Sequence, residues 1–384
     1  MKPKVAVISY PWKSNAPYKF LSDILKILEP ISSKIVLING NTDRISVTSK
    51  IVDVKDTRIK MHYLKEIRPV SYSAIIWIVK CILAQFKASI EVIKVRKEVD
   101  IVLFYVAYPY YLLPLITSKI IGKKTIEVIT RSKSNSVPSK ILSLQDPIFF
   151  MLLDGISPES MSLIRELGLE KYKNKLLPDG ARFIDITRYN IKKKLNERKN
   201  LVGFIGRLIK EKGIVEFVKA IPIIAKENKE VIFLIGGSGD MLEWVKEECN
   251  ELMNKEAINI TITGWIGQEL PDYLNELKLL VLPTYTDAFP TIILEAMACG
   301  TPVLATPVGA IPCLIKDGET GFIMEKNSTD CIEKNVMRVL MHPNLDVIVE
   351  NAKKSIEENY TYAAAIERYR KILENCNEDT SSEL

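Results

Sequence analysis

The chain has 384 residues, of which 47% are hydrophobic and 26% are charged, and these values exclude a disordered chain. The length predicts two domains, each large enough to bury its own core. No uninterrupted apolar run reaches about 18 residues, so we expect no membrane-spanning helix. The net charge of +6 is uneven: residues 1–190 hold 30 basic and 17 acidic residues, a balance of +13, which leaves −7 for the rest.

Short apolar runs bounded by turn residues recur along the chain and alternate with longer helix-like stretches. The first run, 5–9, is too short for the apolar region of a signal peptide and is typical of a buried strand. We expect further strands at 34–38, 101–105, 125–129, 201–205, 231–235, 258–263, 279–282 and 302–305. Near-continuous Val, Ile and Leu strands that alternate with helices are typical of parallel sheets covered on both faces. The predicted fold class is therefore α/β, with two Rossmann-like, doubly wound parallel-sheet domains.

The expected boundary between the domains lies near residue 190. The stretch 189–200 is rich in Lys, Arg and Glu and is predicted to be an exposed linker, at the point where the charge balance changes sign. We therefore expect an N-terminal domain over 1–190 and a C-terminal domain over 191–359.

The segment 71–97 departs from the pattern of an ordinary soluble helix. Many Ile, Val, Leu and Phe residues and Trp77 fall among Lys80, Lys87, Lys94, Arg96 and Lys97. One interpretation is a helix buried in the core over most of its surface. The other is an amphipathic helix on an anionic membrane surface, anchored by tryptophan and lysines.

The cysteines and histidines point to no metal site and no disulfide framework. The six cysteines are scattered without Cys-x-x-Cys spacing, which is typical of a reducing cytosol. His62 and His342 lack metal-ligand spacing, so we expect no structural metal. These features predict a cytoplasmic protein.

The first chemical motif, 204–213, follows a predicted strand and opens a helix over 214–225. Gly206 lets the backbone approach a ligand closely, and a helix N-terminus supplies N–H donors. Arg207 and Lys212 add two positive charges, which suit a diphosphate. The alternative is a strand–turn–helix with solvated charges.

The second motif is the glycine-rich turn Gly236-Gly237-Ser238-Gly239, again after a predicted strand. It resembles half of a dinucleotide fingerprint, or it is a tight turn without a ligand. Its spacing does not match G-x-G-x-x-G, which argues against a nicotinamide dehydrogenase.

The third motif, 282–303, is the strongest. A strand ends, a loop presents Asp287, and Pro290 stands where a helix can begin without losing a needed N–H. Glu295 then lies about one and a half turns inside that helix. Loop amides over 287–291 suit phosphate oxygens, while Glu295 suits ribose hydroxyls. A buried structural glutamate with its own partner is the alternative.

Together these motifs resemble the nucleotide-sugar domain of the GT-B glycosyltransferases of family 4, the retaining group 1 transferases. The family pattern G-R-L-x-x-x-K-G corresponds to 206–213, and E-x7-E-A-M-A-x-G-x-P-V corresponds to 287–303, which begins with Asp instead of Glu. Gly264-Trp265-Ile266, Gly309-Ala310 and 317–322 fit the intervening pattern. The resemblance covers about 200–375, with Pro178-Asp179-Gly180 ahead of it.

The resemblance implies a GT-B fold, two domains that face each other across a cleft, and a C-terminal helix over about 360–376 that packs back onto the N-terminal domain. It implies transfer of a hexose from a UDP-sugar or GDP-sugar with retained configuration, without a cofactor or metal. Catalytic roles fall to Asp287, Arg207 and Lys212. The implied donor-binding set is Gly206, Arg207, Lys212, Gly237, Gly239, Trp265, Ile266, Asp287, Ala288, Phe289, Pro290, Thr291 and Glu295.

The N-terminal domain departs from the family pattern. The loop 9–17 lacks the usual Gly-Gly pair, and the segment 125–132 lacks the usual His. Lys13, Ser14, Asn15 and Arg131 are the residues expected to contact substrate from this domain. Its positive balance favours an anionic acceptor, such as a polyprenyl-phosphate-linked glycan or glycolipid at the cytosolic membrane face.

Three other functions remain open from the sequence. One is a nucleotide-sugar-binding partner protein without transfer activity, and the others are a GT-B-like epimerase and a GT-B-like phosphorylase. No stacking-aromatic and basic pattern of the RRM or OB type is present, so no nucleic-acid partner is expected.

Overall fold

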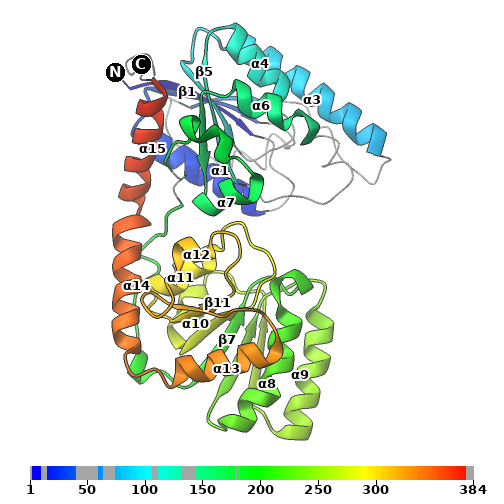
Figure 1. Ribbon diagram of the computed structural model, residues 1–384, viewed down its shortest axis with the longest axis vertical. Coiled ribbons are helices and arrows are strands. Elements are labelled where there is room, and N and C mark those ends of the chain that lie inside the picture. The colour runs from blue at the N-terminus through cyan, green and yellow to red at the C-terminus, as the bar shows by residue number, and fades with distance from the viewer. Residues whose placement is uncertain are drawn as a thin grey trace. The chain divides into compact units, whose positions relative to one another are not determined.

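The computed structural model describes residues 2–9, 15–39, 59–63, 74–105, 111–130, 143–178, 180 and 182–377. The chain forms two compact units (Figure 1). The N-terminal unit comprises residues 1–181 and 365–384, and the C-terminal unit comprises residues 182–364. Among the described residues, no helix is both long and apolar enough to cross a bilayer.

The N-terminal unit is a parallel sheet with helices on its faces. Its described strands pair in the order β3-β2-β1-β4-β5-β6, and all of these pairings are parallel. The strands are β1 (Lys4–Ser9), β2 (Lys34–Asn39), β3 (Ile59–Tyr63), β4 (Ile101–Tyr105), β5 (Lys124–Ile129) and β6 (Gly155–Pro158). The helices are α1 (Asn15–Leu28), α3 (Ala74–Lys94), α4 (Leu112–Ile120), α6 (Asp146–Leu152), α7 (Met161–Leu167) and α15 (Tyr362–Asn377), with 3-10 turns at Ser143–Gln145 and Glu170–Lys175.

The C-terminal unit repeats this architecture. Its described strands pair in parallel in the order β12-β11-β10-β7-β8-β9. The strands are β7 (Leu201–Ile205), β8 (Ile232–Gly236), β9 (Ile260–Gly264), β10 (Leu279–Leu282), β11 (Val303–Ala305) and β12 (Phe322–Ile323). The helices are α8 (Ile214–Glu227), α9 (Leu242–Glu256), α10 (Leu270–Glu276), α11 (Thr291–Ala298), α12 (Ile311–Leu314), α13 (Thr329–Leu340) and α14 (Leu345–Asn359), with 3-10 turns at Leu195–Glu197 and Lys210–Lys212.

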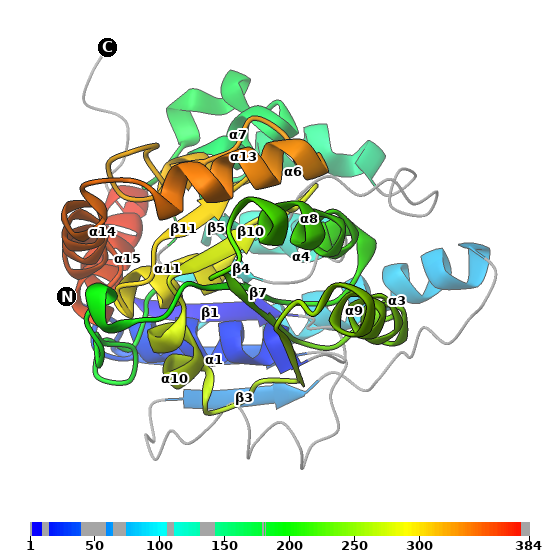
Figure 2. The ribbon, with the colours of Figure 1, turned by 90° about the horizontal axis from the view of Figure 1, so that it is seen from below.

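Two hydrophobic clusters cover the two faces of the C-terminal sheet. One joins the strands to α8, α9 and α13, and α8 and α13 lie side by side (Figure 2). The other joins the strands to α10, α11 and α12. Because both faces are covered, the strands are apolar on both sides, as their near-continuous Val, Ile and Leu content predicted. The predicted class of two doubly wound parallel-sheet domains is confirmed.

The strands that the sequence did not predict lie at the edges of the sheets. These are β3, β6 and β12. Ile59–Tyr63 carries Lys60 and His62, β6 includes Gly155 and Pro158, and β12 has only two residues. Edge strands need no continuous apolar run, so their sequences lack the signal that identified the central strands.

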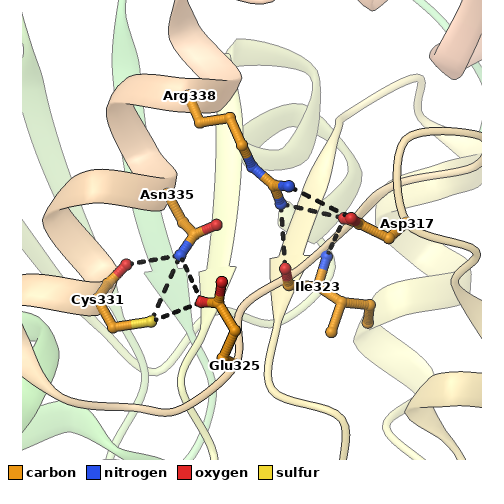
Figure 3. Close-up of polar contacts among 6 residues, drawn as sticks. All are labelled: Asp317, Ile323, Glu325, Cys331, Asn335 and Arg338. Atoms are coloured by element: carbon orange, nitrogen blue, oxygen red, sulfur yellow. Dashed lines mark hydrogen bonds and ion pairs between the residues drawn. The ribbon is translucent and has the colours of Figure 1, made fainter.

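The edge strand β12 is closed by side chains (Figure 3). The Ile323 N–H donates to Asp317 Oδ1 at 2.8 Å, and the Ile323 carbonyl accepts from Arg338 Nη2 at 3.0 Å. Arg338 also pairs with Asp317 at 3.0 Å. These bonds occupy backbone groups that an open edge would offer to another strand. Asp317 of the family-like motif over 317–322 therefore protects this edge of the sheet.

The stretch 189–200 is not the exposed linker that its charge predicted. Tyr189 and Arg198 are buried, and the backbone N–H of Lys192 donates to Asn275 Oδ1 at 2.7 Å. The prediction was wrong because it rested on the number of charges. The lysine side chains pair with surface carboxylates, while Tyr189, Leu195 and Arg198 are buried and the backbone bonds to Asn275 of α10.

The unit boundaries accordingly differ from the expected ones. They fall at 181/182 and 364/365 rather than at 190/191 and about 360. The Ile184 N–H donates to the Tyr360 carbonyl at 2.8 Å and so ties the beginning of the C-terminal unit to the end of α14. Residues from 365 onward, within α15, cluster with the N-terminal unit.

Arg198 is the polar centre of this region and is only 5% exposed. Its guanidinium donates to the carbonyls of Leu277 at 2.9 Å, Cys299 at 2.7 Å and Lys193 at 2.8 Å. It also donates to Thr301 Oγ1 at 2.9 Å. Burial lowers the pKa of Arg198 to about 10, so the group stays charged at neutral pH.

We expect Arg198→Met to lower the free energy of unfolding of the C-terminal unit by about 3 kcal/mol, because several buried carbonyls lose their donor. Denaturant titration followed by circular dichroism measures this change. Arg207→Met is the control: Arg207 is exposed and forms no ion pair among the described residues, so its loss should change stability by less than about 0.5 kcal/mol. Equal effects of the two substitutions would contradict the conclusion that the buried bonds of Arg198 stabilise the C-terminal unit.

Candidate functional site

A cavity of about 360 Å³ lies at the carboxyl ends of the strands of the C-terminal unit. Its lining residues are Phe204, Ile205, Gly206, Arg207, Lys212, Gly237, Trp265, Ile266, Leu270, Leu282, Thr284, Asp287, Phe289, Pro290, Thr291, Ile292 and Glu295. The strand order places β7 beside β10, and the chain leaves these two strands toward opposite sides of the sheet. Open α/β sheets bind ligands at such a switch point.

The cavity brings together most of the donor-binding residues implied by the sequence. Of that set, only Gly239 and Ala288 are absent from its lining. The Ala288 carbonyl instead accepts from the Ala310 N–H at 3.2 Å, and this bond ties the loop after β10 to the start of α12.

The glycine-rich turn after β8 supports the turn after β7. Gly237 has φ +140°, and a Cβ there would lie 1.8 Å from the Gly206 carbonyl oxygen. A Cβ on Gly239 would lie 2.4 Å from the Leu208 carbonyl oxygen. The Leu208 N–H donates to the Ser238 carbonyl at 2.9 Å. Both glycines therefore permit close backbone packing, and Gly237 also reaches the cavity wall.

The helix N-terminus at the cavity is not the one expected from the first motif. Gly213, which precedes α8, packs beneath Pro283, where a Cβ would lie 1.9 Å from the carbonyl oxygen. Neither Gly213 nor Ile214 lines the cavity. Thr291 and Ile292, in the first turn of α11, do line it. The positive end of a helix dipole at this site therefore belongs to α11.

Lys212 and Asp287 connect the β7 turn to the loop after β10. Lys212 Nζ lies 2.6 Å from Asp287 Oδ2 and donates to the Thr286 carbonyl at 3.1 Å. Thr284 Oγ1 donates to the Thr286 carbonyl at 2.9 Å and so shapes the same loop. Arg207 is exposed at the cavity, and no ion pair engages it among the residues that the structure describes.

Glu295 is 5% exposed and reaches the cavity from the second turn of α11. The hydroxyl of Tyr189 is hydrogen-bonded to its carboxylate. Burial and the negative charge of Glu295 raise the pKa of Tyr189, so that phenol stays protonated and donates. This partner could not be predicted from the sequence, because Tyr189 lies about a hundred residues away in a stretch that looked like a linker.

An apolar wall completes the cavity. Phe204, Ile205, Leu270, Leu282 and Ile292 line it and were not predicted as site residues, because each looks like an ordinary core residue in the sequence. Trp265 also lines it but is 77% exposed, which is unusual for such a large apolar side chain. The cavity thus combines a hydrophobic wall with a few polar groups, as small-molecule sites do.

The expected contacts from the N-terminal unit remain predictions. Lys13, Ser14 and Arg131 lie outside the described residues, and Asn15 begins α1 with a side chain that is also outside them. Within the described part of the chain, no group of three His, Cys, Asp or Glu side chains is placed to hold a metal ion.

We expect Gly237→Ala to lower the free energy of unfolding by about 2 kcal/mol or more, because its Cβ meets the Gly206 carbonyl at a strained φ. Gly267→Ala is the control, since its Cβ meets only Trp265 Nε1, at 3.8 Å. Thermal unfolding of the two variants measures the difference. Equal stability of the two variants would show that the turns after β7 and β8 can move apart without a loss of stability.

Comparison with known proteins supports this description of the C-terminal unit. Residues 185–359 match the family described as glycosyl transferases group 1. The chain is 29% identical over 271 residues to the uncharacterized glycosyltransferase MJ1069 of Methanocaldococcus jannaschii, covering 67% of this chain and 60% of that protein. It is 24% identical over 221 residues to the UDP-Gal:alpha-D-GlcNAc-diphosphoundecaprenol alpha-1,3-galactosyltransferase of Escherichia coli, covering 54% of this chain and 56% of that protein. The matches thus span less than two thirds of either relative.

Among solved structures, Anabaena Alr3699/HepE in complex with UDP and glucose matches with a TM-score of 0.71 and 15% identity. The match covers 97% of this chain and 99% of that chain, and at this low identity it is evidence of a shared fold only. The fold is therefore GT-B, and residues 185–359 match the family of the glycosyl transferases group 1.

Proposed function

We propose that this protein is a retaining glycosyltransferase that moves a hexose from a nucleoside-diphosphate sugar to an acceptor. One observation carries the proposal: the switch-point cavity presents Arg207 and Lys212 together with the carboxylate of Glu295. Cations suit a diphosphate, and a carboxylate suits the paired hydroxyls of a ribose.

The cavity also suits the size and polarity of a nucleotide. Its volume of about 360 Å³ lies within the usual range for small-molecule sites. The apolar wall with Trp265 offers a surface for a base, while the first-turn amides of α11 suit phosphate oxygens. UDP is named with the Anabaena structure and UDP-galactose with the Escherichia coli relative, so UDP-sugars are the first donors to test, followed by GDP-sugars.

In the proposed reaction, the bond between the anomeric carbon and the diphosphate oxygen breaks, and an acceptor oxygen bonds to that carbon on the same face. The acceptor proton passes to the leaving phosphate. Arg207 and Lys212 stabilise the charge that develops on that phosphate, a role that needs no metal. Asp287, whose Oδ2 lies 2.6 Å from Lys212 Nζ, orients this cation. In the proposed complex the same carboxylate lies next to the donor sugar.

We propose a lipid-linked glycan or glycolipid at the cytosolic membrane face as the acceptor. The balance of +13 over residues 1–190 suits an anionic acceptor. The name of the Escherichia coli relative, which includes diphosphoundecaprenol, supports the same class.

A thermal-shift panel of UDP, GDP, ADP and their hexose conjugates tests the donor site. A ligand at about 100 times its Kd should stabilise the protein by roughly 2.7 kcal/mol. Glu295→Ala should weaken nucleotide binding by about 1.5–3 kcal/mol, because charge-assisted bonds to the ribose are lost, and so lower this stabilisation by about half or more. Glu319→Ala, at an exposed turn of the same unit, should respond like the unaltered protein.

The outcomes of this panel separate the proposed function from its alternatives. No response to any nucleotide would contradict the donor site. Binding without transfer to any acceptor would favour a partner protein without activity. Conversion of the nucleotide sugar without acceptor would indicate an epimerase, and consumption of inorganic phosphate would indicate a phosphorylase.

We expect Lys212→Ala to lower kcat by about 10²–10³ with a smaller change in KM, because Lys212 acts on charge that develops in the transition state. Steady-state kinetics with the donor identified above measures the two constants. Lys219→Ala, on the exposed face of α8, is the control and should leave both unchanged. A rise in KM alone would mean that Lys212 only holds the substrate.

A further inference from the structure

The helix α3 of the N-terminal unit has its large apolar side chains on the outside. Val79, Ile82, Leu83, Phe86, Ile90 and Ile93 are between 42% and 55% exposed. Their spacing of three, four and seven residues places them on one side of the helix. Monomeric soluble proteins rarely expose an apolar surface of this extent without a function for it.

The buried side of the same helix carries smaller side chains than the exposed side. The buried residues are Cys81, Ala84, Gln85, Ala88, Ser89 and Val92, and α3 packs beside α4 (Figure 1). A helix whose only apolar contact is the core has the reverse arrangement, with its largest hydrophobic residues turned inward. The outward side of α3 therefore needs a second apolar environment.

Positive charges border this apolar stripe. Lys87 and Lys94 are seven residues apart and so lie on one flank of it, and Lys94 is well exposed. Arg96 and Lys97 are exposed directly after the helix, where Arg96 donates to the Ile93 carbonyl at 3.0 Å. An apolar stripe with flanking lysines matches the boundary between acyl chains and anionic headgroups.

Of the acidic side chains over 91–100, Glu98 and Asp100 have partners on other elements, whereas Glu91 offsets part of the charge of Lys94. The Glu91 carboxylate lies 2.8 Å from His62 Nδ1 and 2.7 Å from Lys94 Nζ. Glu98 pairs with Lys34 at 2.6 Å and with Lys60 at 3.0 Å, and these two lysines lower its pKa to about 2. Asp100 accepts from the Lys4 N–H at 2.9 Å.

We infer that the outward stripe of α3 docks on the surface of a bilayer that contains anionic lipids. The occupant is lipid rather than a second copy of the chain because the stripe is a single convex helix with one cationic flank. In a symmetric antiparallel pair of such helices, each flank meets its own counterpart, so lysines would face lysines. The inference adds a membrane surface to the proposed transferase and does not depend on the donor site.

Flotation of the full chain with lipid vesicles tests this inference. At low ionic strength the protein should bind phosphatidylglycerol–phosphatidylcholine vesicles and bind pure phosphatidylcholine weakly, and salt should reduce the binding. The double variant Leu83→Glu/Phe86→Glu should lose about tenfold or more in apparent affinity. The matched control is Met341→Glu/Val347→Glu, at residues of the C-terminal unit that are 69% and 53% exposed, and it should bind like the unaltered chain.

A second variant keeps the test decisive if the first one folds poorly. Lys87→Gln/Lys94→Gln leaves the apolar stripe intact and should lower binding to anionic vesicles only. Circular dichroism and the nucleotide response of the same samples report folding and the donor site separately. No vesicle binding by the unaltered chain would overturn the inference, and so would self-association that Leu83→Glu/Phe86→Glu abolishes, which would make the stripe a dimer interface.

Discussion

The cavity of the C-terminal unit depends on one buried charge, the guanidinium of Arg198. It donates to carbonyls at the ends of α10 and α11, where backbone acceptors have no partner within the helix. A cation at this end also opposes the negative pole of the helix dipole. Because α11 has only eight residues, it is not stable by itself, and its position follows from such contacts. The charge of Arg198 thereby fixes the helix that carries Glu295 and begins at the cavity.

Backbone contacts between neighbouring turns fix the opposite side of the cavity. The Gly206 N–H donates to the Gly236 carbonyl at 3.0 Å, and the Gly237 N–H donates to the Gly264 carbonyl at 2.6 Å. The turns after β7, β8 and β9 are thus joined in sequence across the sheet. The ion pair of Lys212 and Asp287 then connects the first of these turns to the loop after β10. A site held by such short contacts reorganises little when charge develops in it, which is the condition for electrostatic stabilisation.

The sequence predicted those parts of the structure that local rules determine. The central strands followed from continuous apolar runs, and the residues around Gly206 and Asp287 followed from glycine and charge spacing. Arg198 and Tyr189 could not be predicted, because their roles depend on carbonyls and a carboxylate that are distant in the chain. A buried arginine in a lysine-rich stretch has the same sequence signature as a solvated one. The difference arises only when α10 and α11 end beside it.

Periodicity alone left α3 undecided for a related reason. Apolar residues on both sides of a helix are compatible with a core helix and with a membrane-surface helix, because the hydropathy of the residues does not tell which side packs against the core. Side-chain size separates the two: Ala84 and Ala88 face the sheet, while Phe86 and Ile90 face outward. Close packing on a sheet favours small residues, whereas partition into lipid grows with apolar area. The partner proposed for the N-terminal unit therefore rests on a surface, whereas the ligand proposed for the C-terminal unit rests on motifs.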